Sequence, residues 1–133
     1  MPWKLFDFID HRGRNVISDW ISSQQRDHQG RIKVKLLTLV MAGSELPPKL
    51  LTPTRERSVL EICIKTNVSF RLLVCRGPLN VNKEFTLLYG CKERDRKYVP
   101  ANAPEIAERH RQQLIVDIAT RRCEHEHFKE FLG

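Results

Sequence analysis

Segment 87–100 is dense in charged side chains: four cations and two carboxylates lie within a few residues of one another. The cations are Lys92, Arg94, Arg96 and Lys97. An apolar run ends just before them and Pro100 follows, a pattern typical of a strand that leads into a loop. Guanidinium and ammonium groups held in one place attract anionic groups such as phosphate. The segment therefore predicts a binding site for an anionic ligand.

The overall composition agrees with an anionic partner. The chain has 133 residues, 41% of them apolar, and a formal net charge of +7, which fits one domain with a hydrophobic core. No apolar run is long enough to span a membrane, and the amino-terminal residues lack the pattern of a secretion signal. We therefore expect a cytoplasmic protein that does not enter a membrane. The four cysteines form no Cys-x-x-Cys pair, so we expect no disulfide, no metal and no cofactor.

The first third of the chain is predicted to form a strand and two helices. Residues 3–9 alternate imperfectly between apolar and polar types, which indicates a strand. Asn15 is a plausible cap for a short amphipathic helix, because its side-chain oxygen can accept from the first free backbone N–H groups. A second amphipathic helix is expected to begin near Asp27 and to end at Gly43. Segment 44–53 contains three prolines and is expected to be a surface linker.

The remaining elements are predicted to carry the charged segment. Apolar alternation in 59–65 and in 70–75 indicates a β-hairpin, and 85–89 indicates a further strand that enters the charged loop. A last amphipathic helix is expected from Pro104 onward, because proline and glutamate both suit a first helical turn. This sheet is expected to bring Glu61, Lys65 and Arg71 to the loop on the face that the helices leave open.

The resulting order of elements is strand, helix, helix, strand, strand, strand, helix. It predicts an α+β fold with a mostly antiparallel four-stranded sheet, two amino-terminal helices and one carboxy-terminal helix, all on one face of the sheet. We expect one domain over residues 1–122 and a polar tail over residues 123–133. Cys123, His125 and His127 in the tail have metal-binding side chains, but their spacing lacks a second group of ligands, so a tail is favoured over a zinc site.

Three stretches of the chain together follow a known family pattern. They are Glu-Ile-Cys-Ile-Lys at 61–65, Phe-Arg-Leu-Leu-Val at 70–74 and Tyr-Gly-Cys-Lys-Glu-Arg-Asp-Arg-Lys-Tyr at 89–98. With the helix beyond them, they resemble the RelE/ParE toxin superfamily, in particular its HigB-like, phage-derived branch. The first strand and the two helices fit as well, so the resemblance covers roughly residues 3–118. It implies a RelE-like fold and a toxin of a type II toxin–antitoxin system.

The resemblance implies an endoribonuclease that inhibits growth by cleaving messenger RNA, usually on the ribosome and without a metal ion. In such cleavage the 2′-hydroxyl of the RNA attacks the scissile phosphate. By position in the family pattern, Arg71 contacts that phosphate, Lys92 is a second phosphate-stabilising cation, and Tyr98 stacks on a base and assists proton transfer. The further RNA-binding residues would be Lys65, Arg94, Arg96 and Lys97. The implied partners are mRNA, the ribosome and a cognate antitoxin protein.

Glu61 and Cys63 depart from the family pattern, which has lysines on this strand. Glu61 is a candidate general base, or it indicates a site that binds without cleaving. Arg71 could instead form a structural pair with Glu61, and Tyr98 could cap the sheet edge. Base action by Tyr98 would require nearby cations to lower its pKa from about 10. The alternative function is therefore non-nucleolytic: a ParE-like topoisomerase inhibitor, or an inactive module that binds an antitoxin or nucleic acid.

Overall fold

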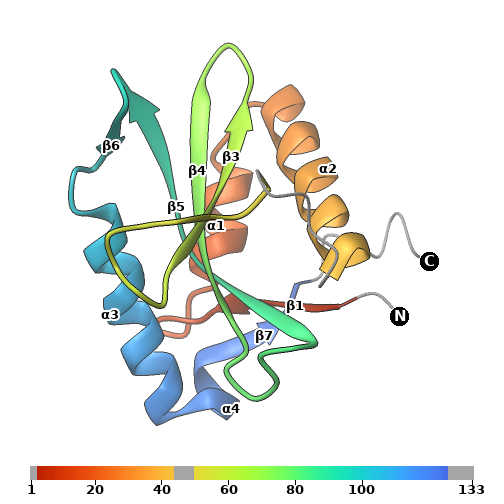
Figure 1. Cartoon of the computed structure of the whole chain (residues 1–133), viewed down its shortest axis with the longest axis vertical. Coiled ribbons are helices and arrows are strands. Elements are labelled where there is room, and N and C mark those ends of the chain that lie inside the picture. Colours follow the sequence, from red (N-terminus) through yellow and green to blue (C-terminus); the bar gives the residue numbers. More distant parts are fainter. Residues whose placement is uncertain (1–2, 44–49, 126–133) are drawn as a thin grey trace.

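The centre of the molecule is a mixed β-sheet with helices on both of its faces (Figure 1). The computed structural model describes residues 3–43 and 50–125, which form seven strands and four helices. The strands are β1 (Lys4–Phe8), β2 (Thr52–Pro53), β3 (Leu60–Lys65), β4 (Ser69–Arg76), β5 (Glu84–Arg94), β6 (Lys97–Val99) and β7 (Arg122–Glu124). The helices are α1 (Val16–Ser22), α2 (Arg26–Ala42), α3 (Ala103–Val116) and α4 (Ile118–Arg121).

The strand order is β2-β3-β4-β5-β1-β7, and β6 also pairs with the end of β5. Strands β1 and β5 run parallel, and every other described pair is antiparallel. The β3–β4 hairpin sets Cys63 opposite Arg71, and the β4–β5 pairing sets Arg71 opposite Cys91. Because directly opposed residues share a face of a sheet, these three side chains lie on the same face.

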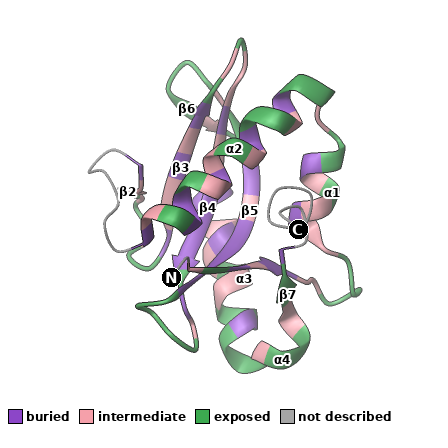
Figure 2. Ribbon diagram, turned by 90° about the vertical axis from the view of Figure 1, so that its right-hand side faces the viewer, coloured by how far each residue is buried: buried purple, intermediate pink, exposed green. Residues whose placement is uncertain are grey.

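Two hydrophobic cores occupy the two faces of the sheet. On one face, α1 and α2 pack against the alternate residues of β3 and β4, with Ile21, Leu36, Ile62 and Phe70 fully buried. On the other face, α3 packs through Ala107 and its neighbours against the opposite side of the same strands. Figure 2 shows the buried residues concentrated along β4 and β5, between the two helical layers. The period-two alternation of the strands thus supplies both cores.

Several predicted elements are confirmed. The strand in 3–9, the two helices after it, the hairpin and the last helix are all present. Asn15 caps α1, since its Oδ1 accepts from the backbone N–H groups of Ile17 at 3.1 Å and Ser18 at 2.8 Å. Gly43 follows α2 with a φ of +53°, in the left-handed region that favours glycine, and a Cβ there would collide with the Trp3 indole.

The predicted four-stranded sheet with all helices on one face is wrong. α3 lies on the face opposite α1 and α2, and the sheet gains β2, β6 and β7. The charged segment is also not a loop: β5 continues to Arg94, and the chain reverses at Asp95 and Arg96 into β6. Both turn residues have positive φ, 52° and 64°, which is the geometry of a tight hairpin turn.

The predicted linker and tail fall partly outside the described residues. Residues 44–49 of the linker are not described, and Thr52–Pro53 beyond them form β2. Residues 126–133 of the tail, which include His127, are not described either. The domain boundary expected at residue 122 falls at the start of β7, which pairs antiparallel with β1. Across the two described ranges, no helix is long and apolar enough to cross a membrane.

Candidate functional site

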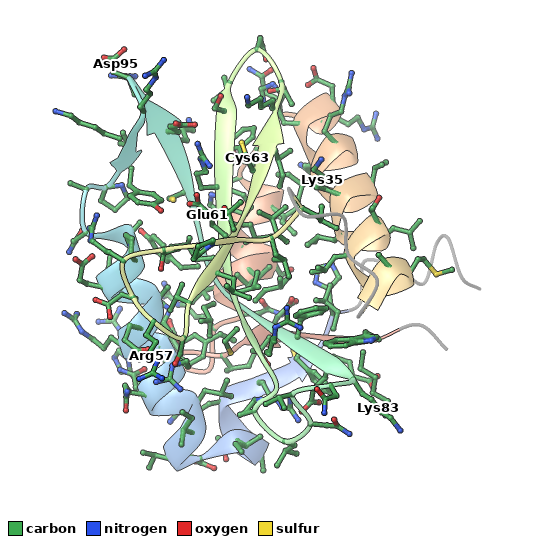
Figure 3. All side chains as sticks on the ribbon, in the orientation of Figure 1. Lys35, Arg57, Glu61, Cys63, Lys83 and Asp95 are labelled. Atoms are coloured by element: carbon green, nitrogen blue, oxygen red, sulfur yellow. The ribbon has the colours of Figure 1, made fainter. Side chains whose placement is uncertain are left out.

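The candidate site lies on the α3 face of the sheet, beyond the part that α3 covers. Glu61 on β3, Arg71 on β4 and Glu93 on β5 come from three adjacent strands and point to this same face. Figure 3 shows Glu61 near the middle of the sheet and Cys63 further along the same strand, with Asp95 at the tip of the β5–β6 hairpin. The strand register alone therefore brings together residues that are far apart in the sequence.

Arg71 is held between two carboxylates. Its Nη1 lies 3.0 Å from Glu61 Oε1, and its Nη2 and Nε lie 2.7 Å and 3.1 Å from Glu93 Oε2. The three side chains are only 20%, 12% and 15% exposed, respectively. Burial works to lower the pKa of Arg71, but the hydrogen bond to Glu93 and the charge of Glu61 outweigh it and raise that pKa. Arg71 is therefore a fixed cation whose orientation is set by both neighbouring strands.

Tyr98 completes this network from β6. Its hydroxyl donates to Glu61 Oε2 at 2.7 Å, and the guanidinium of Arg55 lies 5.7 Å from the centre of its ring. Burial, the hydrogen bond to Glu61 and the negative charge of Glu61 raise the pKa of Tyr98 well above its usual value of 10. The sequence-based condition for base action, a lowered pKa, is therefore not met. In this environment Tyr98 keeps its proton at neutral pH and is a proton donor.

Glu61 is the centre of the network. One of its oxygens accepts from Arg71 and from the Thr52 hydroxyl, at 3.0 Å and 3.3 Å, and the other accepts from Tyr98. A single carboxylate thus holds a cation on one oxygen and a proton donor on the other. A base, an acid and a charge-stabilising group are the kinds of group that general acid–base chemistry at a phosphate uses.

Two hollows adjoin the network. A small one of about 100 Å³ is lined by Glu61, Arg71, Glu93, Arg96, Lys97 and Tyr98. A larger one of about 550 Å³ is lined by Lys65, Ser69, Arg71, Glu93, Asp95 and Arg96. They share Arg71, Glu93 and Arg96, so the Arg71–Glu93 pair stands between them. The larger hollow has the size of a small-molecule site and presents donors and acceptors together.

The structure separates the predicted cations into two groups. Lys65, Arg96 and Lys97 line the hollows beside Arg71. Lys92 is paired with Phe70, whose ring is buried in the core against α1 and α2, so Lys92 belongs to the opposite face of the sheet. Arg94 follows Lys92 at a spacing of two residues and shares that face. Lys92 and Arg94 therefore do not join Arg71 and Tyr98.

The network also contains three residues that the sequence pattern does not indicate: Glu93, Thr52 and Arg55. The sequence pattern places Glu93 in a loop. In the structure Glu93 lies in β5 opposite Ser69 and alternates with Lys92, so its side chain is on the same face as Arg71. Thr52 belongs to β2 and Arg55 to the segment between β2 and β3, and no local pattern marks either residue. Arg55 is fixed by a bidentate ion pair with Glu105 of α3, at 2.7 Å and 2.8 Å.

Cys91, opposite Arg71 on β5, is a buried thiol. Burial raises the pKa of the Cys91 thiol to about 12, so it is protonated at neutral pH. Among residues 3–43 and 50–125, no three His, Cys, Asp or Glu side chains are grouped so that they could hold a metal ion. His125 is instead buried with its Nδ1 2.6 Å from Asp7 Oδ1.

Comparisons with protein-family models, with curated proteins and with solved structures found no match to this chain. The site geometry and the sequence resemblance are therefore the two supports for a functional proposal.

Proposed function

We propose that this protein is a toxin of a toxin–antitoxin system and an endoribonuclease that cleaves messenger RNA. The observation that carries the proposal is the contact of Glu61 with both the Arg71 guanidinium and the Tyr98 hydroxyl, at 3.0 Å and 2.7 Å. The resemblance to the HigB-like branch of the RelE/ParE superfamily points to the same activity. It also implies action without a metal ion, in the cytoplasm and on the ribosome, with neutralisation by an antitoxin protein.

The chemistry assigns one role to each group. Glu61 takes the proton from the 2′-hydroxyl, and that oxygen attacks the adjacent phosphorus. The bond from phosphorus to the 5′-oxygen breaks, and the Tyr98 hydroxyl gives its proton to the leaving oxygen. The products are a 2′,3′-cyclic phosphate and a 5′-hydroxyl. The proton on Glu61 then returns to the Tyr98 oxygen, which is already its hydrogen-bond partner, so the enzyme is restored.

Arg71 stabilises the charge that builds on the phosphate oxygens. Its bonds to Glu61 and Glu93 leave further guanidinium N–H groups for a phosphate, because arginine carries more donors than these contacts use. Arg96 and Lys65 line the adjoining hollow and would bind the flanking nucleotide. In this proposal Lys92 has no catalytic role, since it lies on the other face of the sheet.

The test is primer extension on cellular transcripts after induction of the wild type, Glu61→Gln, Arg71→Ala and Lys92→Gln. We expect new transcript ends with the wild type and with Lys92→Gln. Loss of the general base typically lowers the rate by about 100-fold or more, so Glu61→Gln should give almost no new ends, and Arg71→Ala likewise. Far-ultraviolet circular dichroism of each purified variant would confirm that it is folded.

Two results would contradict parts of this proposal. Growth arrest by the wild type without any new transcript end would overturn the nuclease assignment. A loss of cleavage with Lys92→Gln as large as with Glu61→Gln would overturn the assignment of roles, because it would place Lys92 in the reacting centre.

The alternative is a non-nucleolytic member of the same fold, and the ion pairs of Arg71 with both carboxylates favour it. An arginine that is already neutralised by Glu61 and Glu93 suits a structural network under a binding surface. In that case the protein would be a ParE-like topoisomerase inhibitor, or an inactive module that binds an antitoxin or nucleic acid. A supercoiling assay with purified topoisomerase and this protein separates the inhibitor from the nuclease.

A further inference from the structure

A further pocket, of about 350 Å³, lies beside the carboxyl end of β4. Its lining includes Arg57 from the segment between β2 and β3, Arg76 at the end of β4, and Arg111 on α3. Figure 3 shows the Arg57 side chain beside α3, well away from Glu61. Arginines from three separate segments therefore line a space large enough for a small ligand or a phosphate group.

The charge of this pocket is largely uncompensated. Among the described residues, no carboxylate lines it, and neither Arg57 nor Arg76 forms an ion pair. Arg111 is bound to Glu108 through its Nε, at 2.6 Å and 3.0 Å, which leaves its terminal amino groups for another acceptor. The Arg76 guanidinium also lies 5.8 Å from the centre of the Phe85 ring. This differs from the site around Arg71, where two carboxylates face one arginine.

The buried residue at the base of the pocket is uncharged and does not repel an anion. Cys75 is buried there, and burial raises the pKa of its thiol to about 12, so the sulfur is uncharged at neutral pH. Ser58 adds a hydroxyl at the rim that can donate a hydrogen bond. Arginines with an uncharged floor and a hydroxyl donor form a chemical set that recognises phosphate, because guanidinium groups donate to two phosphate oxygens at once.

The pocket and the candidate reacting centre lie at two different points along β4. Cys75 follows Arg71 by four residues on β4, which at the rise of a strand is about 13 Å. Arg55 and Arg57 both lie on the segment that crosses the sheet between the two places. At about 3.4 Å per nucleotide, a stacked single strand of about four nucleotides covers that distance.

We propose that the pocket of Arg57, Arg76 and Arg111 binds a backbone phosphate of single-stranded RNA, about four nucleotides from the scissile phosphate. This inference rests on the proposed function, because RNA is the polyanion that the candidate site would act on. The pocket acts as a second anchoring point for the substrate, and its contribution is to affinity rather than to the chemical step.

The test is binding of a fluorescently labelled, fully 2′-O-methylated oligoribonucleotide, followed by anisotropy at several salt concentrations. The 2′-O-methyl groups remove the attacking hydroxyl, so binding is measured without cleavage. The variant is Arg57→Gln/Arg76→Gln, and the matched control is Arg26→Gln/Arg31→Gln. The control removes the same charge from exposed positions on α2, on the other face of the sheet.

We expect weaker binding by the pocket variant and a shallower salt dependence than the wild type. Removing one phosphate interaction lowers the slope of log K against log salt by about 0.7, so the slope should fall by about 0.7. The control variant should keep the wild-type slope. A second arm titrates inorganic phosphate at constant ionic strength and follows the arginine Nε–H signals by NMR.

Three results would overturn the proposal. The first is no measurable binding of the oligoribonucleotide by the wild type. The second is an equal fall in slope for the pocket variant and the control, which would show only the effect of net charge. The third is a response to inorganic phosphate with an unchanged RNA slope, which would assign the pocket to a small phosphate compound. If the wild type cleaves no RNA but the pocket variant alone loses slope, the proposed function fails and the phosphate subsite stands.

Discussion

At the scale of single residues, the chemistry of Tyr98 is decided by its neighbours. The sequence places it directly after a run of cations, which would lower the pKa of a phenol. In the folded chain its nearest charged partner is the Glu61 carboxylate, at 2.7 Å, and the pKa is raised instead. The side chain that looks like a candidate base in the sequence is therefore a candidate acid in the structure.

The raised pKa of Tyr98 makes a prediction about stability at alkaline pH. The folded state holds the phenol proton more tightly than the unfolded chain does, whose tyrosine pKa is about 10. The stabilisation is complete below about pH 10 and is lost as the pH rises from there through the folded-state pKa. Between about pH 9 and pH 11, the free energy of unfolding should fall more for the wild type than for Tyr98→Phe.

Urea unfolding of both proteins at these two pH values measures the difference. The Cys75 and Cys91 thiols also titrate at high pH, and both are present in the wild type and in the variant. Parallel losses of stability in wild type and Tyr98→Phe would contradict the pKa shift.

Some site residues can be predicted from the sequence and others cannot, and strand alternation explains the difference. Arg71 and Glu61 lie in a hairpin whose apolar periodicity is clear, so their shared face is predictable. Lys92 and Glu93 follow an apolar strand in a run of charged residues, where periodicity gives no signal for the end of the strand. The side chain of a residue that is expected in a loop cannot be assigned to either face of the sheet. The sequence pattern therefore gives no reason to separate Lys92 from Arg71.

At the scale of elements, the position of α1 against β5 depends on a glycine within the strand. Gly90 is opposite Leu72 on the face that α1 covers, and the Trp20 indole occupies the place where a Cβ at residue 90 would be. The indole also contacts the edge of the Phe70 ring, with ring centres 5.8 Å apart. The close approach of helix and strand therefore requires a residue without a side chain at this point.

Two glycine substitutions separate the effect of this close packing on stability from the effect of helix propensity. Gly90→Ala should lower the free energy of unfolding by about 1–3 kcal/mol, because the added methyl group forces the buried indole to move. Gly30→Ala is the matched control: the added methyl meets nothing within 4 Å inside α2, and it should raise the stability by about 0.5–1 kcal/mol. Thermal or urea unfolding measures both, and equal effects of the two changes would contradict the assignment.

At the scale of the whole molecule, β7 closes one edge of the sheet at the predicted boundary between the domain, which ends at Arg122, and the tail. Arg122 Nη1 lies 3.1 Å from Glu84 Oε2, and both side chains are only 7% exposed. The Arg122 guanidinium also lies 3.7 Å from the centre of the Phe6 ring. These partners are 38 or more residues away in the chain, so no local pattern could predict that the Arg122 side chain is buried.

The Arg122–Glu84 pair predicts a large effect of a single change. Arg122→Met should lower the free energy of unfolding by about 3–5 kcal/mol, because it leaves the Glu84 carboxylate buried without its cation. The double variant Arg122→Met/Glu84→Gln should recover part of this loss, since the introduced amide carries no charge and can still accept from the Asn80 N–H. Urea unfolding of the wild type, the single variants and the double variant measures the coupling, and additive losses would contradict it.

The hairpin of β5 and β6 carries charged side chains on both faces of the sheet. The length of β5 therefore decides which of these charges lie beside Arg71. Glu93 and Tyr98 face the Arg71 network, whereas Lys92 faces the side of α1 and α2. A deletion of one residue between Gly90 and Glu93 would exchange the two sets of side chains between the faces. The amount of charge in the segment would hardly change, but a cation would replace the carboxylate beside Arg71. Evolution can therefore alter the polarity of this surface through a single change in strand length, without recruiting any new charged residue.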